Sequence, residues 1–172
     1  MDFYSVLKQR HSIRSFQEKT VEKEVIEKIL AACILAPSAG NLQSYKIFVT
    51  RSPSVKESLA IAADGQECLE QAAFVLIFCA NQKKASTKYK ERGFELYSIQ
   101  DATIAAAYAQ LAATAEGLAS VWIGSFDSLE VSRIIDLPPY HIPVALIPIG
   151  YPAESPSIRE RQPITKVVKE IQ

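Results

Sequence analysis

The segment Ala102–Ala115 constrains the fold of this chain more than any other, because it holds eight alanines. Alanine is the strongest helix former, Asp101 can cap the start of the helix, and Gly117 suits its C-terminal end. Small side chains on several faces allow other backbones to approach closely. We therefore expect a long central helix from Asp101 to Gly117 that is buried on more than one side.

Hydrophobic periodicity predicts four further helices and four strands around this helix. The helices are expected to begin at the N-caps Asp2, Thr20, Ser52 and Asp127, with Glu130 completing a capping box with Asp127. They are expected to end at Gln9, before Pro37, near Gly65 and before Pro138. Strands are expected at Tyr45–Thr50, Phe74–Ala80, Val121–Ile123 and Ala145–Tyr151. The polar, lysine-rich segment Gln82–Ile99 shows no such pattern and is expected to be a surface excursion.

The distribution of proline indicates how the chain ends. Seven of the nine prolines lie after Leu137, which makes a mainly helical C-terminal part unfavourable. The stretch Tyr151–Pro163 is expected to be an extended arm, and an arm with no place to fold back often packs on a neighbouring molecule.

Length and charge exclude several classes of protein. The 172 residues hold no internal repeat or linker and are expected to form one domain, residues 1–172. Nineteen basic and nineteen acidic residues give no net charge, which argues against a partner that is nucleic acid or an anionic membrane. The N-terminus lacks the layout of a signal peptide, and the longest apolar run, Ala72–Ala80, is too short to cross a bilayer. A soluble, cytoplasmic protein is expected.

Side chains for unaided catalysis are scarce. Cys33, Cys68 and Cys79 form no CxxC pair, so neither a metal site nor a disulfide framework is indicated, and burial as small apolar side chains is expected. His11 and His141 are the only histidines, and the chain contains neither a Walker loop nor a GxGxxG motif. Any chemistry is therefore expected to belong to a bound cofactor.

Two basic segments form the first candidate site. The turn Arg10–Phe16 holds two guanidiniums, an imidazole and two hydroxyls, which together suit an anion cradle, because arginine binds phosphate with a planar fork of donors. Arg159 and Arg161 alternate along the extended arm, so their side chains point to one face. The alternative is that both segments are solvated surface charges.

Two loops of small residues form further candidates. The loop Ala36–Gln43 follows a helix and carries amide and hydroxyl side chains, so it can lie flat against a planar ligand. The segment Trp122–Phe126 can offer backbone N–H groups at the end of a strand. The alternative for the first loop is an ordinary connection between a helix and a strand.

These segments, in this order, resemble the FMN-dependent nitroreductase family. The telling parts are Arg10–Phe16, Ala36–Gln43, Gly117–Phe126 and Leu146–Pro152. The resemblance implies an α+β, nitroreductase-like fold, with a central, mostly antiparallel sheet flanked by helices. It also implies an intertwined homodimer with an exchanged C-terminal arm, in which two FMN molecules lie at the subunit interface.

The resemblance further assigns roles to individual residues. The FMN phosphate and ribityl chain would be bound by Arg10, His11, Ser12 and Arg14, and Arg159 and Arg161 would close on the same phosphate. The other subunit would contribute Pro37, Ser38, Ala39 and Asn41. Gln66 would reach the pyrimidine edge of the flavin, and the backbone of Gly124 and Ser125 would face its N5 and O4 atoms. No side chain is expected to be catalytic, since the flavin carries the chemistry.

The implied activity is an NAD(P)H-dependent FMN oxidoreductase. Hydride would pass from NAD(P)H through flavin N5 to a small-molecule acceptor, nitroaromatic or quinone-like, in ping-pong fashion. Ser44-Tyr45 replaces the proline and large aromatic residue of many relatives, and Gln82–Ile99 is shorter than the corresponding region that covers their substrate. The alternatives are another flavin reaction on the same fold, such as dehalogenation or flavin breakdown, a flavin-binding protein without turnover, and an interaction domain with basic surface patches.

Overall fold

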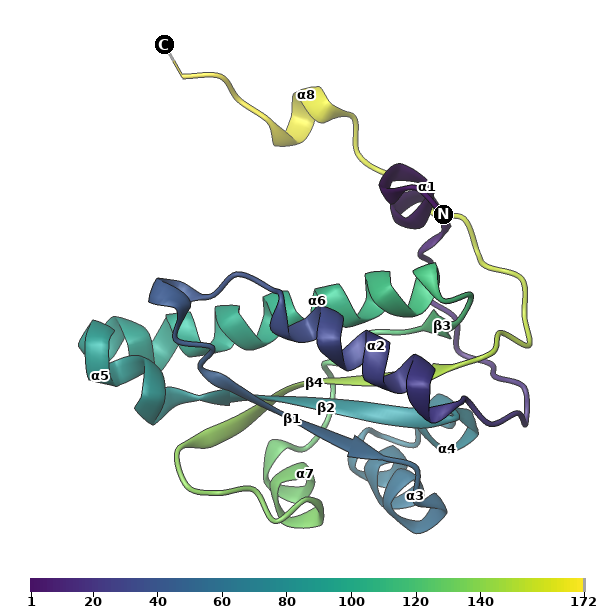
Figure 1. Ribbon diagram of the computed structural model, residues 1–172, viewed down its shortest axis with the longest axis horizontal. Helices are drawn as coiled ribbons and strands as arrows, with labels where there is room; N and C mark the ends of the chain where they lie inside the picture. The colour runs from purple at the N-terminus through teal and green to yellow at the C-terminus, as the bar shows by residue number, and fades with distance from the viewer. Residues whose placement is uncertain (172) are drawn as a thin grey trace.

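The computed structural model describes residues 1–171 and contains a four-stranded antiparallel sheet with helices on both faces (Figure 1). The strand order is β1-β2-β4-β3. The strands are β1 (Tyr45–Thr50), β2 (Phe74–Asn81), β3 (Ala119–Ser120) and β4 (His141–Gly150). The predicted α+β class is confirmed. The strand expected at Val121–Ile123 lies instead at Ala119–Ser120, and Ile123 contributes only an isolated bridge to Leu146.

The central strands are buried on both faces, which separates two hydrophobic cores. Along β2, Val75 and Ile77 point to one face and Phe74 and Leu76 to the other, because successive strand side chains alternate. One face is covered by α3 (Pro53–Ala62), α4 (Cys68–Gln71) and α7 (Ser128–Ile134), and the other by α2 (Lys23–Ile34) and α6 (Ser98–Ala115). Figure 1 shows these two helical layers above and below the sheet.

The alanine-rich helix α6 packs on the sheet and on α2. Its fully buried alanines include Ala105, Ala106 and Ala109. The opposite side of the helix is also apolar but open, since Tyr108 is exposed and Ile104 is only partly buried. Within one chain α6 is therefore buried on one side, and a second apolar side remains free.

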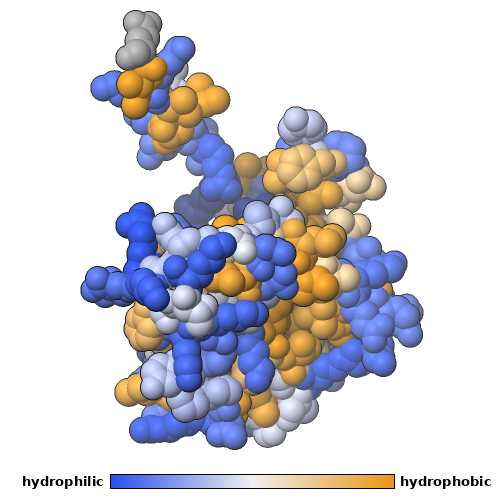
Figure 2. Space-filling model, turned by 60° about the vertical axis from the view of Figure 1, so that its left-hand side comes forward, coloured by the Kyte–Doolittle hydropathy of each residue, from blue (hydrophilic) through white to orange (hydrophobic). Residues whose placement is uncertain are grey.

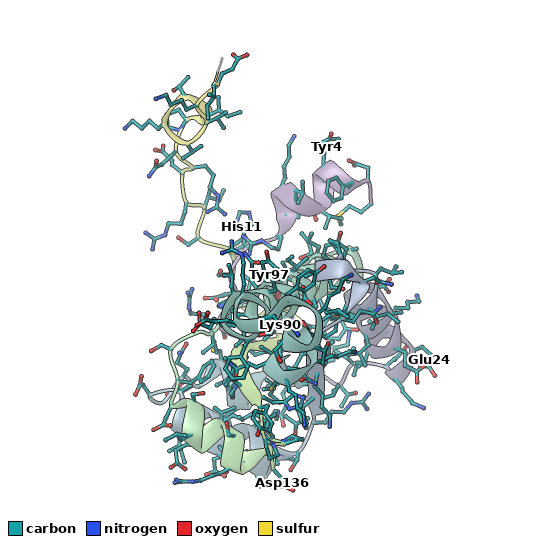
Figure 3. The ribbon with its side chains drawn as sticks, turned by 90° about the vertical axis from the view of Figure 1, so that its left-hand side faces the viewer. Tyr4, His11, Glu24, Lys90, Tyr97 and Asp136 are labelled. Atoms are coloured by element: carbon teal, nitrogen blue, oxygen red, sulfur yellow. The ribbon has the colours of Figure 1, made fainter. Side chains whose placement is uncertain are left out.

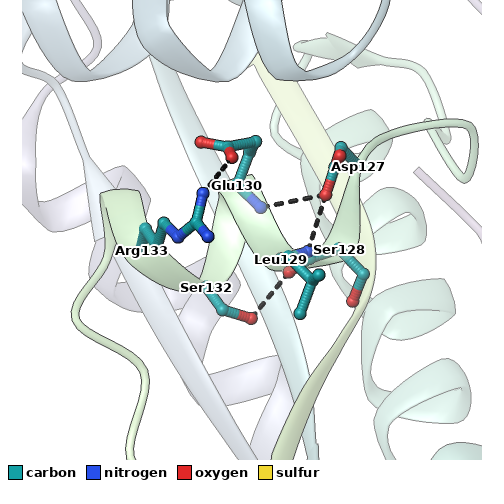
Figure 4. A network of polar contacts seen from close by, with 6 residues as sticks. All are labelled: Asp127, Ser128, Leu129, Glu130, Ser132 and Arg133. Atoms are coloured by element: carbon teal, nitrogen blue, oxygen red, sulfur yellow. Dashed lines mark hydrogen bonds and ion pairs between the residues drawn. The ribbon is translucent and has the colours of Figure 1, made fainter.

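The predicted helix starts are correct in part. Asp2 caps α1 (Phe3–Gln9), and Asp127 caps α7 by accepting hydrogen bonds from the Leu129 and Glu130 amides at 2.8 and 3.0 Å (Figure 4). Glu130 pairs with Arg133 rather than with the cap residue, so the capping box is incomplete. The start predicted at Thr20 is wrong, since α2 begins at Lys23. The helix ends agree with the expectations, since α2 ends at Ile34 before Pro37, α3 at Ala62 near Gly65 and α7 at Ile134 before Pro138.

The segment Gln82–Ile99 lies mostly at the surface, as expected, but it is helical, which its sequence pattern did not predict. The segment forms α5 (Gln82–Arg92) and a π-helical turn, η2 (Gly93–Tyr97), which leads directly into α6. Its sequence lacks an apolar stripe because few of its side chains, such as Ala85, are buried. A kink at Lys90 (φ 51°) lets the two pieces fold onto each other, and a Cβ at Gly93 would collide with the Ala85 carbonyl.

The C-terminal arm leaves the body after β4 and is exposed along its length, as expected from its prolines (Figure 1). It ends in one helical turn, α8 (Ile164–Val167). Figure 2 shows hydrophobic side chains on the surface of the arm and of α1. Among residues 1–171, no helix is both long and apolar enough to span a membrane.

Candidate functional site

One cleft brings together six predicted residues from the two ends of the chain. It has a volume of about 600 Å³ and lies between α1, the turn that follows α1, and the arm. Its lining includes Arg10, His11, Ser12 and Arg14 from the turn and Arg159 and Arg161 from the arm. The arginines lie about 150 residues apart in the sequence, and only the tertiary structure makes them neighbours.

The cleft carries uncompensated positive charge. The ion pairs within residues 1–171 are Lys23–Glu27, Lys28–Glu116 and Arg133–Glu130, and none of them involves an arginine of the cleft. Four guanidiniums, an imidazole and a hydroxyl supply many hydrogen-bond donors and no fixed anion. This donor set fits a phosphate dianion, since guanidinium keeps its charge at all physiological pH values and binds phosphate bidentately.

Backbone hydrogen bonds fix the turn that carries Arg14. The Ile13 amide donates to the Ser120 carbonyl at 3.1 Å, which attaches the turn to β3. On its other side, the Ala153 amide donates to Ser15 at 2.9 Å. The Glu154 carboxylate accepts a hydrogen bond from the Arg14 amide at 2.5 Å. Ala153 and Glu154, at the start of the arm, therefore orient the turn, and the arm contributes its two arginines further along the chain.

The loop that contains Pro37, Ser38, Ala39 and Asn41 lies elsewhere in the chain. Pro37, Ser38 and Ala39 line a second cavity of about 490 Å³ together with Tyr97, Gln100, Asp101, Thr103 and Ile104. None of the four loop residues lines the arginine cleft. A single chain therefore presents two separate parts of the predicted site.

A buried carboxylate fixes this second part. Asp101 was expected to cap the alanine-rich helix, but it lies inside α6 and is buried. It accepts hydrogen bonds from the Ala39 amide at 2.9 Å and from the Ser44 amide and hydroxyl at 3.2 and 2.5 Å. Both ends of the loop are thus tied to one side chain, and the charge-assisted bonds are stronger than neutral ones.

The same loop holds an unusual backbone. Gly40, Asn41 and Gln43 adopt φ values of 56°, 57° and 48°. This left-handed region costs glycine little and other residues more, so it persists where surrounding contacts impose it. The Ser38 hydroxyl accepts from the Gln43 amide at 2.9 Å, and the Gln43 side chain donates to that of Asn41. A loop shaped in this way presents its small residues in a fixed arrangement.

The remaining predicted residues lie between helices on the α3 side of the sheet. Gln66 lies in the connection between α3 and α4, where its backbone N–H donates to the Ala63 carbonyl. Gly124 and Ser125 precede the Asp127 cap, whose amide donates to the Ala62 carbonyl at 2.8 Å. None of Gln66, Gly124 and Ser125 lines either cavity described above.

Sequence reasoning missed several residues around the two cavities. Tyr4, Leu7, Lys8 and Ser157 also line the arginine cleft, and their separate positions in the sequence carry no motif. Asp101 and Glu154 hold the loop and the turn in place. For Asp101 the available signal was a single carboxylate beside the alanines of a helix that was expected to be buried. A buried acidic side chain needs hydrogen-bond partners, so such partners could have been expected.

The three cysteines are buried, as expected. Burial raises the pKa of the Cys33 and Cys79 thiols to about 12, so both remain protonated at neutral pH. Residues 1–171 also contain no group of three His, Cys, Asp or Glu side chains arranged to hold a metal ion.

Comparison with known proteins identifies the family of the chain. The sequence profile of the Nitroreductase family matches residues 7–66 and 61–151. A relative from Methanothermobacter thermautotrophicus, provisionally named NADH dehydrogenase/NAD(P)H nitroreductase, is 34% identical over 93% of this chain and 82% of its own length. A relative from Bacillus subtilis named FMN reductase (NAD(P)H) is 30% identical over 91% of this chain and 68% of its own length.

A solved structure extends the comparison to the fold. The crystal structure of nitroreductase A from Vibrio parahaemolyticus matches with a TM-score of 0.90 and 29% identity, covering 100% of this chain and 77% of that one. The matched profile runs from the end of α1 to β4 and so includes the basic turn, the loop and the whole sheet. The chain belongs to the nitroreductase family.

Proposed function

We propose that this protein is an FMN-dependent oxidoreductase that uses NAD(P)H to reduce nitroaromatic or quinone-like acceptors. The observation that carries the proposal is the cleft in which Arg10, Arg14, Arg159 and Arg161 converge without a carboxylate partner among residues 1–171. Relatives named as an NAD(P)H nitroreductase and as an FMN reductase support it.

The residues of the cleft would bind the phosphate end of FMN. The four guanidiniums neutralise its charge, and Ser12 and His11 add donors on the same wall. The flavin, when bound, supplies the hydride chemistry that this chain's side chains lack. The backbone amides of Gly124 and Ser125 and the side chain of Gln66 would orient the ring system.

We infer that the functional unit is a homodimer, because one chain keeps the arginine cleft and the Pro37–Asn41 loop apart. The free apolar side of α6, with the exposed Tyr108, is a suitable contact surface. The arm carries strongly exposed apolar side chains, at Ile158 (82%), Ile164 (73%) and Ile171 (90%). Such side chains favour burial against a second copy.

The absorption spectrum of the purified protein, with and without added FMN, tests the cofactor. The variant Arg14→Ala/Arg161→Ala should weaken FMN binding by at least tenfold, because each lost charge-assisted bond contributes about 1.5–3 kcal/mol. The control Arg51→Ala/Arg133→Ala removes two arginines outside the cleft and should bind FMN normally. Equal FMN affinity in all three proteins would place the phosphate elsewhere.

Anaerobic mixing with NADH or NADPH tests the activity. The flavin absorbance should bleach and then return when a nitroaromatic compound or a quinone is added. A protein that binds FMN but is not reduced by either nucleotide would instead be a flavin-binding protein without turnover.

A further inference from the structure

Two lysines of α5 lie on the strained loop beside the second cavity. The Lys84 ammonium donates to the Gln43 carbonyl at 3.3 Å. A Cβ placed on Gly40 would lie 2.6 Å from the Lys88 ammonium and 2.5 Å from the Tyr89 hydroxyl, so these groups cover the loop at its left-handed residue. Lys84 is therefore bonded to the segment whose Ser38 lines the cavity, and Lys88 lies close to Gly40 of the same segment.

A third cation is held at the same cavity by one of its lining side chains. The Arg92 Nε donates to the Tyr97 hydroxyl at 2.9 Å, and its guanidinium lies 5.4 Å from the centre of the Tyr97 ring. Tyr97 lines the cavity together with Ser38 and Ala39. Figure 3 looks onto this end of the molecule, with Tyr97 and the kink residue Lys90 labelled at its centre.

These charges are not balanced by ion pairs. None of Lys84, Lys88 and Arg92 takes part in an ion pair within residues 1–171, and all three are exposed. Asp101 lines the cavity, but both of its oxygens already accept hydrogen bonds from Ala39 and Ser44. The three cations do not line the cavity themselves, but they contact the loop and the tyrosine that do. An anion at this edge of the cavity therefore has unpaired cations nearby and a carboxylate whose charge is already stabilised by donors.

We propose that Lys84, Lys88 and Arg92 form a rim subsite for an anionic group of the electron donor or of the acceptor. The group is either a phosphate of the nicotinamide nucleotide or a carboxylate of the acceptor that the enzyme reduces. This inference rests on the proposed function, because it assigns a charge preference to the substrates of that same reaction. A cavity of about 490 Å³ suits a small molecule, and three cations on a chain with no net charge are few for nucleic acid.

The test compares charged and uncharged substrates in the FMN-loaded protein. The variants are Lys84→Gln/Lys88→Gln and the triple variant that adds Arg92→Gln. The control Lys23→Gln/Arg133→Gln removes two exposed cations from α2 and α7, which lie away from the cavity. The donor experiment compares NADPH and NADH with the uncharged 1-benzyl-1,4-dihydronicotinamide, using a neutral quinone as acceptor. The acceptor experiment compares 4-nitrobenzoate with the uncharged 4-nitrobenzamide.

The double variant should raise KM for the anionic compound roughly tenfold in either the donor or the acceptor experiment, because two exposed charge pairs with the anion are lost. KM for the uncharged partner should change less than twofold. The experiment that responds, donor or acceptor, identifies the source of the anion. The effect should shrink in high salt as screening increases. Calorimetry provides a second readout, since the dissociation constant of NADP⁺ or of 4-nitrobenzoate should rise in parallel.

Equal changes in KM for charged and uncharged compounds, or no change in KM in either experiment, would overturn the rim subsite. If the wild-type protein binds FMN but no donor reduces it, the proposed function fails instead. The calorimetric titrations then still decide whether the three cations bind an anion, because they do not depend on turnover.

Discussion

Asp101 is the residue on which the shape of the Pro37–Ser44 loop depends. Its two oxygens hold the loop at Ala39 and at Ser44, although the chain between these residues passes through left-handed backbone. A carboxylate suits this position because it accepts hydrogen bonds without offering a donor, and all its neighbours here are donors.

Replacing Asp101 by alanine should lower the free energy of unfolding by about 3 kcal/mol, because it leaves buried donors without an acceptor. Asp101→Asn should lose roughly half as much, since one amide oxygen still accepts. Urea unfolding measures both variants, and Gln100→Ala, at the exposed neighbouring position, is the control. An alanine variant as stable as the wild type would show that the loop is held by other contacts.

Glu154 has a comparable role at the arginine cleft. Its carboxylate could compete with a bound phosphate for guanidiniums, but within residues 1–171 it forms no ion pair and accepts from the Arg14 amide. The negative charge therefore helps to shape the turn and leaves the arginine side chains available.

Glu154→Ala should weaken FMN binding roughly tenfold by releasing the Arg14 backbone, a bond to a charged acceptor being worth about 1.5–3 kcal/mol. Glu154→Gln should bind FMN as well as the wild type, because the amide oxygen can accept the same bond. Fluorescence titration with FMN and with riboflavin, which has no phosphate, checks the cause. A loss of affinity that is equal for both ligands would contradict a role through Arg14.

At the scale of elements, a helix with little buried surface depends on the contacts at its start. The helix α7 illustrates this, since it is seven residues long and buries only Val131. Its start depends on the Asp127 side chain, which caps the Leu129 and Glu130 amides, and on the Asp127 backbone, which bonds to α3 (Figure 4). Because Gly124 and Ser125 lie shortly before this cap, the start of the helix also limits where the backbone that we assign to the flavin can lie.

Asp127→Ala should destabilise the protein by about 1 kcal/mol, the usual cost of losing an N-cap side chain. Thermal unfolding measures the change, and Asp127→Asn should restore most of the stability because it can also cap. Ser128→Ala, one residue into the helix and exposed, should have little effect. A cap variant that unfolds like the wild type would show that packing alone positions α7.

At the scale of the whole molecule, the arm has two functions in the proposed dimer. It supplies Arg159 and Arg161 to the cleft, and it carries exposed apolar side chains such as Ile164. Beyond Pro163, its described backbone hydrogen bonds are local, from Lys166 to Pro163 and from Val168 to Ile164. Its removal should therefore leave the sheet and both cores intact.

A chain that ends at Pro156 should keep its far-UV circular dichroism but lose FMN affinity and shift from dimer towards monomer in light scattering. The full-length variant Arg159→Ala/Arg161→Ala separates the two effects, since it should bind FMN weakly and remain a dimer. A truncated protein that is fully dimeric would place the contact between copies on α6 alone.

The sequence was most informative where one local signal decides the structure. The β2 strand follows from its unbroken apolar run, and the Asp2 and Asp127 caps from single side chains that bond to nearby amides. It was least informative at α5, because a helix with almost no buried face has no periodicity to detect. Asp101 was expected at a helix start because it directly precedes the alanine-rich segment. Its hydrogen-bond partners lie 57 and 62 residues away, where no local pattern reveals them.

By itself, the sequence determined which residues could bind an anion, since the two pairs of arginines and their spacing are visible in the printed chain. Only the tertiary structure decided that these pairs share one cleft, that Glu154 bonds to an amide rather than to a guanidinium, and that the Pro37–Asn41 loop faces a different cavity. The physical reason is that charge and propensity are properties of single residues and short segments. The meeting of distant segments depends on the two cores that fix the sheet and its helices.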